Sequence, residues 1–187
     1  MRSNSEVSHL IEQHVKVELT DPESTEAQQL LDRLSQTLQH FTGSSGAASF
    51  DVNDVKVEGA CFAIGRLAGG IPVACGALRP LQPGVAELKR MFALPDTKGA
   101  GSAVLAFLEQ KACEFGYGQV WLETRKVNER AVAFYERHGY RPIPNFGRYV
   151  GRTEAICLGK RIPTLPNGAS GPPQRPAPSR MESPTPP

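Results

Sequence analysis

The sequence predicts a single α/β domain, and three observations support this prediction. The chain has 187 residues, of which 40% are hydrophobic, so it can bury one substantial core but is short for two domains. Segments with strand-like and helix-like spacing alternate along residues 15–162. A glycine-rich stretch, residues 98–103, lies between an extended apolar segment and an amphipathic helical one. We therefore expect one sheet flanked by helices over residues 15–162.

The first part of this domain should be a strand, a helix and three further strands. Alternation over residues 15–19 indicates a strand, and Asp21 followed by Pro22 indicates the start of a helix that ends at Gly43. The apolar stripe of this helix consists of Leu30, Leu31, Leu34 and Leu38. After a flexible connection over residues 43–49, we expect strands over residues 60–67, 72–78 and 85–93.

The second part should contain two helices and three strands. Apolar residues at helical spacing predict a helix over residues 99–115, which Gly116 ends. A short buried strand over residues 119–123 follows, and Asn128 caps a helix that runs to His138. The last strands are expected over residues 140–142 and 154–159.

The two ends of the chain differ in composition from this domain. Residues 163–187 hold nine of the 16 prolines and few apolar residues, so they cannot bury enough surface to fold. We expect residues 163–187 to form a disordered tail and residues 1–14 to form a loose leader.

Charge and cysteine usage narrow the classes of function. The net charge of +2, from 21 basic and 19 acidic residues, indicates neither a nucleic-acid nor a membrane partner. The first residues contain no apolar run long enough for a secretory signal or a membrane span, so a cytoplasmic location is expected. The four cysteines lack the spacing of a metal site, and we expect buried free thiols, three on strands and one on a helix: Cys61, Cys75, Cys113 and Cys157.

The glycine-rich stretch has the features of a phosphate site. The first turn of a helix leaves N–H groups unpaired and carries about half a positive charge. Gly99 and Gly101 allow close approach of an anion, and Lys98 can add a charge. A helix that merely begins in a glycine-rich turn would look the same, so the stretch alone leaves both interpretations open.

Two familiar phosphate motifs do not fit. A P-loop has its lysine after the glycines, whereas Lys98 precedes them, and a dinucleotide fingerprint requires a glycine where Val104 stands. What remains is a basic residue or Gln, two residues, Gly, one residue, then Gly or Ala. This pattern resembles the acyl-CoA loop of the GNAT N-acetyltransferase superfamily, in which Arg or Gln usually occupies the position of Lys98.

Two further motifs strengthen the resemblance, which covers about residues 15–162. The strand AELKRMFALP precedes the loop, and NERAVAFYERHGY follows it, like the family's Asn, Ala, Tyr and Gly-Tyr pattern. The later IPNFGRY is similar to a stretch of family members that act on small molecules. The resemblance implies a mixed, mostly antiparallel twisted sheet that is splayed between its fourth and fifth strands. It also implies acetyl-CoA as co-substrate without a metal, with these binding residues: Phe92, Ala93, Lys98, Gly99, Ala100, Gly101, Ser102, Ala103 and Asn128.

Acetyl transfer to an amine requires a base, because an amine with a pKa near 10.4 is mostly protonated at neutral pH. Glu87 is the first candidate, since it stands where the histone-modifying branch of the family has its base. Glu123, at the end of the next strand, is the second. The alternative for Glu87 is a salt-bridged strand residue beside Lys89 or Arg90. The sequence leaves the choice between the two glutamates open.

The resemblance also places other groups. Backbone N–H groups around Phe92 and Ala93 would stabilise the oxyanion. Tyr135 lies two helical turns after Asn128 and fits a general acid for the leaving thiolate, the alternative being aromatic packing. Lys89 and Arg90 should fall on opposite faces of one strand, so at least one charge must meet water, a partner or an anion such as an acceptor carboxylate.

The predicted function is transfer of an acetyl group from acetyl-CoA to a primary amine of a small molecule, such as an amino acid or a polyamine-like compound. Direct transfer in a ternary complex is expected, because no cysteine lies within the three motifs. Two alternatives stay open: a CoA-binding regulatory module with weak catalysis, and an enzyme that acetylates protein lysines or N-termini. A monomer or a homodimer is expected.

Overall fold

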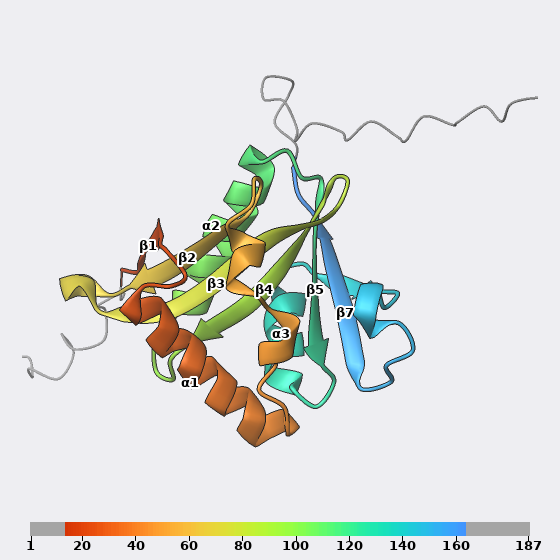
Figure 1. Cartoon of the computed structure of the whole chain (residues 1–187), viewed down its shortest axis with the longest axis horizontal. Coiled ribbons are helices and arrows are strands. Elements are labelled where there is room, and N and C mark those ends of the chain that lie inside the picture. Colours follow the sequence, from red (N-terminus) through yellow and green to blue (C-terminus); the bar gives the residue numbers. More distant parts are fainter. Residues whose placement is uncertain (1–13, 164–187) are drawn as a thin grey trace, which may run out of the picture.

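The computed structural model describes residues 14–163, which form a seven-stranded sheet with three α-helices (Figure 1). In chain order the strands are β1 (Lys16–Leu19), β2 (Cys61–Arg66), β3 (Pro72–Gln82), β4 (Val85–Ala93), β5 (Gln119–Arg125), β6 (Arg141–Ile143) and β7 (Ala155–Arg161). The α-helices are α1 (Thr25–Thr42), α2 (Ala100–Glu114) and α3 (Glu129–Arg137), and short 3₁₀ helices are η2 (Ala47–Ser49), η3 (Val52–Val55), η4 (Ala68–Gly70) and η5 (Gly147–Tyr149). The predicted leader and tail lie almost wholly outside the described residues.

The order of the strands is β1-β2-β3-β4-β5-β7-β6, and β4 with β5 is the parallel pair among otherwise antiparallel neighbours. The pairing of β4 with β5 ends early. Its last matched residues are Glu87 and Trp121, although β4 continues to Ala93 and β5 to Arg125. The prediction of a mixed, mostly antiparallel sheet splayed between the fourth and fifth strands is therefore confirmed.

Each face of the sheet carries its own core. On one face the apolar side of α2, including Val104, Leu105 and Leu108, packs against strand residues such as Ala74 and Leu88. On the other face Leu30 and Leu31 of α1 pack against Phe62, Ile64 and Cys75. Figure 1 shows α1 in front of the sheet and α2 behind it. We refer to these as the α1 face and the α2 face.

The start of α1 corrects the sequence prediction. Ser24, not Asp21, is the N-cap: its backbone is extended and its Oγ accepts a hydrogen bond from the Ala27 N–H at 3.3 Å. The Asp21 carboxylate instead accepts from the Glu23 N–H at 2.9 Å, within a turn that precedes the helix. The predicted end is confirmed, because Gly43 has a left-handed φ of 70° there.

The cysteines lie on the elements expected of them. Cys61, Cys75 and Cys157 are buried strand residues, Cys113 is half-buried on α2, and all four are free. Burial raises the pKa of Cys61 to about 11 and that of Cys75 to about 12. These two thiols stay protonated at neutral pH, which makes them poor nucleophiles.

Within residues 14–163, no helix combines the length and apolar character that crossing a membrane requires.

Candidate active site

The stretch of residues 98–103 forms the N-terminus of α2, as predicted. Gly99 is the N-cap with a φ of 79°, a conformation that glycine adopts without strain. Within the described residues, no acceptor pairs with the N–H groups of Gly99, Gly101 and Ser102. The turn is open at Gly99, because a Cβ atom built there would meet nothing within 4 Å. Unpaired N–H groups, a helix N-terminus and open space fit the diphosphate of an acyl-CoA.

A histidine holds the first turn of α2 in place. The Nδ1 of His138 lies 2.7 Å from the Phe134 carbonyl oxygen and must donate to it, so in the neutral ring Nε2 accepts from the Ser102 hydroxyl at 3.0 Å. This contact joins the end of α3 to the stretch around Gly99. Residues 36 positions apart give no sequence signal of such a contact.

The last residues of β4 pair with a neighbouring strand on one side only. Phe92 and Ala93 pair with Cys75 and Ala74 of β3, but the pairing of β4 with β5 has already ended at Glu87. Backbone groups on the β5 side of this segment therefore have no strand partner among the described strands. The Leu94 N–H donates to the Val73 carbonyl oxygen of β3, so the N–H of the neighbouring Ala93 points to the β5 side. It is among the N–H groups that the resemblance assigns to oxyanion stabilisation.

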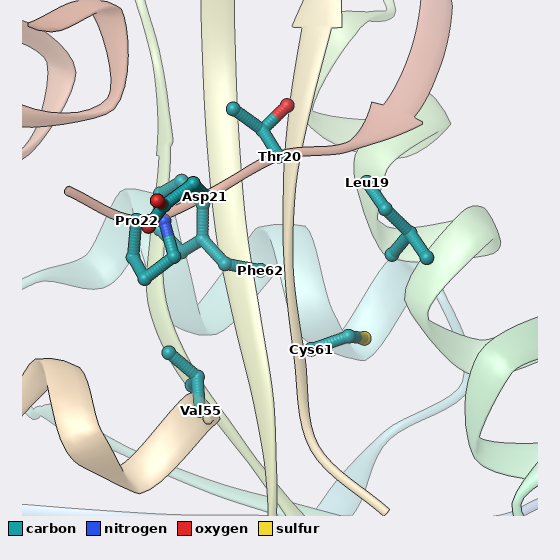
Figure 2. A pocket seen from close by; sticks show the side chains of 7 residues that line it. All are labelled: Leu19, Thr20, Asp21, Pro22, Val55, Cys61 and Phe62. Carbon is teal, nitrogen blue, oxygen red and sulfur yellow. The ribbon is translucent and has the colours of Figure 1, made fainter. Parts of the chain in front are cut away.

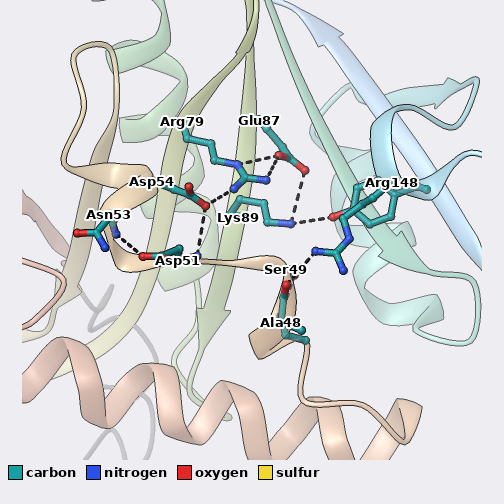
Figure 3. Close-up of polar contacts among 11 residues, drawn as sticks. Ala48, Ser49, Asp51, Asn53, Asp54, Arg79, Glu87, Lys89 and Arg148 are labelled. Atoms are coloured by element: carbon teal, nitrogen blue, oxygen red, sulfur yellow. Dashed lines mark hydrogen bonds and ion pairs between the residues drawn. The ribbon is translucent and has the colours of Figure 1, made fainter.

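Glu87 lies at the centre of a buried ion-pair network (Figure 3). Its carboxylate is 1% exposed and accepts from Arg79 Nε at 2.9 Å and Nη2 at 2.7 Å, while Lys89 Nζ lies 3.5 Å from its other oxygen. Arg79 also pairs with Asp54 of η3. Two cations neutralise the Glu87 carboxylate, and almost none of its surface is left for a substrate. These contacts match the alternative interpretation, a salt-bridged strand residue, although its main partner is Arg79.

Lys89 connects this network to the C-terminal part of the domain. Its ammonium donates to the Tyr149 hydroxyl at 2.8 Å, and both side chains are buried. Burial lowers the pKa of Lys89, although the neighbouring Glu87 opposes this change. Tyr149 belongs to the IPNFGRY stretch, so this stretch reaches the middle of the α1 face.

Glu123 has a different environment from Glu87. It lies on β5, two residues beyond the last residue paired with β4, and is half-buried. Within the described residues its carboxylate forms neither a hydrogen bond nor an ion pair. Burial raises its pKa, and nearby Lys89 and Arg125 lessen that rise. Glu123 is thus a carboxylate free to accept a proton, held where β4 and β5 diverge.

The predicted orientation of Lys89 and Arg90 is wrong. Gly76 of β3 faces two residues of β4, Arg90 and Met91, so the strand has a β-bulge, and Arg90 has a φ of 53°. The bulge interrupts the alternation of side chains. The guanidinium of Arg90 donates to Ser35 of α1, so Arg90 and Lys89 both point to the α1 face.

Asn128 is the N-cap of α3, as predicted, and its side-chain oxygen accepts from the Ala131 N–H at 3.2 Å. That contact is a helix cap; its role toward acetyl-CoA stays a prediction. Tyr135 is 8% exposed and packs edge-on against Phe134 and Tyr140 at 5.2 and 5.6 Å between ring centroids. Its hydroxyl forms no hydrogen bond within residues 14–163, and burial raises its pKa.

Two hollows of the surface lie away from the predicted catalytic residues Glu87 and Tyr135. Figure 2 shows one of about 330 Å³ at the junction of β1 and α1. It is lined by Leu19, Thr20, Asp21, Pro22, Val55, Cys61 and Phe62. A second, of about 260 Å³, lies beside the exposed side of α3. Neither is lined by a predicted catalytic residue, and within residues 14–163 no cluster of His, Cys, Asp and Glu could hold a metal ion.

A splayed mixed sheet with an open glycine turn at the N-terminus of the helix after β4 is the architecture expected of an acyl-CoA-dependent transferase. Comparison with known proteins specifies the family. Residues 20–140, well over half of the chain, match the family described as Acetyltransferase (GNAT) family. The chain therefore belongs to the GNAT acetyltransferase family, whose members use acetyl-CoA.

Individual relatives agree with this assignment. The chain is 27% identical over 124 residues to an IAA acetyltransferase of Azospirillum brasilense, which covers 65% of this chain and 80% of that protein. Its fold resembles an acetyltransferase from Streptococcus agalactiae, with a TM-score of 0.66, 19% identity and coverage of 80% of this chain and 99% of that one. It also resembles the PaiA N-acetyltransferase from Thermoplasma acidophilum in complex with coenzyme A, with a TM-score of 0.59, 14% identity and coverage of 79% and 99%.

Proposed function

We propose that this chain transfers an acetyl group from acetyl-CoA to a primary amine of a small molecule, directly within a ternary complex. The observation that carries the proposal is the free, half-buried carboxylate of Glu123 at the point where β4 and β5 diverge. An ammonium group must lose a proton before it can attack a thioester. A carboxylate with a raised pKa is a stronger base than an ordinary glutamate, and Glu123 has no partner within the described residues to compete for that proton.

The other requirements of acetyl transfer, binding of acetyl-CoA and stabilisation of the oxyanion, are met by groups near the point where β4 and β5 diverge. Acetyl-CoA, when bound, supplies the activated acetyl group. The N–H groups of Gly99, Gly101 and Ser102 would hold its diphosphate, and the unpaired edge of β4 around Phe92 and Ala93 would stabilise negative charge on the carbonyl oxygen. Glu123 takes one proton from the ammonium group, and the freed amine nitrogen forms a bond to the carbonyl carbon. The carbon–sulfur bond breaks, Tyr135 gives a proton to the leaving thiolate, and the second proton that the nitrogen loses restores the Tyr135 hydroxyl.

The choice of Glu123 over Glu87 rests on their partners. Glu87 is 1% exposed and bonded to Arg79, so taking up a proton would cost it a buried ion pair. Glu123 would lose no such contact among the described residues. Direct transfer is supported by the high pKa values of Cys61 and Cys75, since neither offers a thiolate for a covalent acetyl-enzyme.

Tyr135 is the proposed acid for the thiolate. Its hydroxyl is protonated at neutral pH and forms no hydrogen bond within residues 14–163 that would compete for its proton, so it can act as a donor. We expect Tyr135→Phe to lower kcat by about 100-fold, the scale of general acid catalysis, while hardly changing the Kd for acetyl-CoA. Phenylalanine keeps the packing against Phe134 and Tyr140. Steady-state kinetics and calorimetry check this, and a large loss of affinity with kcat maintained would make Tyr135 a binding residue.

The function itself is tested by thiol release from acetyl-CoA across a panel of amines, amino acids and peptides. Release that depends on a small amine supports the proposal. Binding of acetyl-CoA without turnover on any acceptor would favour a regulatory module. Turnover confined to lysine peptides or to protein N-termini would favour modification of proteins instead.

A further inference from the structure

The half-buried arginines of the domain differ in how their charge is balanced. Arg66 pairs with Glu18 and Glu26, and Arg79 pairs with Asp54 and Glu87, so each has two carboxylates. Arg90 is also half-buried, but it forms no ion pair within residues 14–163. Burying a cation without an anion is unfavourable, and burial accordingly lowers the pKa of Arg90. An anion from outside the described residues would balance it.

The Arg90 side chain is held in a fixed position with donors to spare. Nη2 donates to Ser35 Oγ at 3.2 Å, Nη1 donates to the Ser45 carbonyl oxygen at 3.2 Å, and the guanidinium lies 5.6 Å from the centre of the Phe50 ring. Its Nε–H is fully buried and has no partner. A guanidinium has five N–H donors. Two are bonded and the Nε–H is buried, so one N–H on Nη1 and one on Nη2 remain for a ligand. Such a fixed, planar group matches the geometry of a carboxylate.

A second guanidinium approaches the same turn, residues 45–48. Arg148 of η5 reaches across the α1 face and donates to the Ala48 carbonyl oxygen at 2.9 Å (Figure 3). It too forms no ion pair with the residues that the structure describes. Because Ser45 and Ala48 are three residues apart, the turn brings the two uncompensated cations to one side of the α1 face.

This side of the sheet is also where the proposed base acts. Lys89 and Tyr149 join β4 to η5 on the α1 face, and Lys89 influences the pKa of Glu123. We propose that the acceptor is an amine that also carries a carboxylate, an amino acid in the broad sense, with Arg90 and Arg148 binding the carboxylate. This inference rests on the proposed function and specifies its substrate class. It favours amino acids over polyamines and other amines without an anionic group.

The test compares each amino acid with the amine that it would give on decarboxylation, such as lysine with cadaverine and phenylalanine with phenethylamine. We expect kcat/KM to favour the amino acid, and Arg90→Met to lower this preference by about 10- to 100-fold, the worth of hydrogen bonds to a charged group. The change should appear in KM of the amino acid rather than in kcat. Arg148→Met, at an exposed position, should act in the same direction, and Arg33→Met on the exposed side of α1 should change nothing.

Three outcomes would overturn the inference. The enzyme could prefer the decarboxylated amine, Arg90→Met could lower kcat/KM equally for the amino acid and its decarboxylated amine, or Arg33→Met could lower the preference as much as Arg90→Met does. If Arg90→Met fails to fold, Arg148→Met decides on the same readout. If no amine is acetylated, the proposed function fails, and binding of amino acids to the CoA complex is measured by calorimetry. Binding that Arg148→Met weakens would still support the carboxylate site, and no binding would contradict it.

Discussion

Glu123→Gln is expected to lower kcat/KM by about 10²- to 10⁴-fold, the range for removal of a general base, without lowering Tm. Glutamine has the same shape but cannot take a proton from the acceptor amine. The stability should not fall, because Glu123 has no ion pair within the described residues to lose. A carboxyl whose folded pKa is raised destabilises the fold as pH rises above its ordinary pKa, so its removal is neutral or stabilising at neutral pH.

The pH dependence gives this prediction a second readout. Since burial raises the pKa of Glu123, kcat/KM should fall on the acid side at a pH above the ordinary glutamate pKa of about 4.3. Glu123→Gln should remove this fall in kcat/KM on the acid side, so that only the titration of the acceptor amine shapes the pH profile. Glu58→Gln, an exposed glutamate, is the matched control. An unchanged rate and pH profile in Glu123→Gln would exclude Glu123 as the base.

Glu87→Gln should have its main effect on stability. The substitution leaves Lys89 without its carboxylate and leaves Arg79 paired with Asp54 alone. Breaking a buried ion pair in this way costs about 3 kcal/mol, which corresponds to a fall in Tm of about 6 to 12 °C in a domain of this size. Thermal unfolding followed by circular dichroism measures this, again with Glu58→Gln as control.

The same variant separates the two candidate bases. If Glu87 were the base, Glu87→Gln would lower the rate at neutral pH and would abolish the acid limb of the pH profile. If Glu87 supports the fold, as its burial and its contacts with Arg79 indicate, the acid limb persists in the molecules that remain folded. A stable Glu87→Gln protein without an acid limb would reverse our assignment of the two glutamates.

The features predicted from the sequence are those with local causes. The turn around Gly99 and the cap at Asn128 depend on neighbouring residues, and both lie where they were expected. Hydrophobic spacing located all seven strands and three α-helices to within a few residues. The start of α1 was misplaced because Asp21 and Ser24 are both good cap residues and Pro22 favoured the first.

The missed features depend on contacts between distant segments. The predicted strand ended at residue 78, but β3 continues to Gln82, which places Arg79 directly opposite Glu87. A prediction that extended this strand to residue 82 and joined it to the next strand by a hairpin would have placed Arg79 opposite Glu87. The bulge at Arg90 has no such signal, since a left-handed φ usually requires glycine. It places Arg90 on the same face as Lys89, where opposite faces were predicted.

Direct acetylation of an amine is tested with acetyl-CoA labelled in its acetyl group, mixed with the full chain and an amino acid acceptor. Mass spectrometry then follows the label in the acceptor and in the intact protein. We expect one labelled N-acetyl group on the acceptor for each thiol released, with the protein unmodified. Acetyl-CoA that binds while the acceptor stays unlabelled, or a label that passes through the protein, would contradict it.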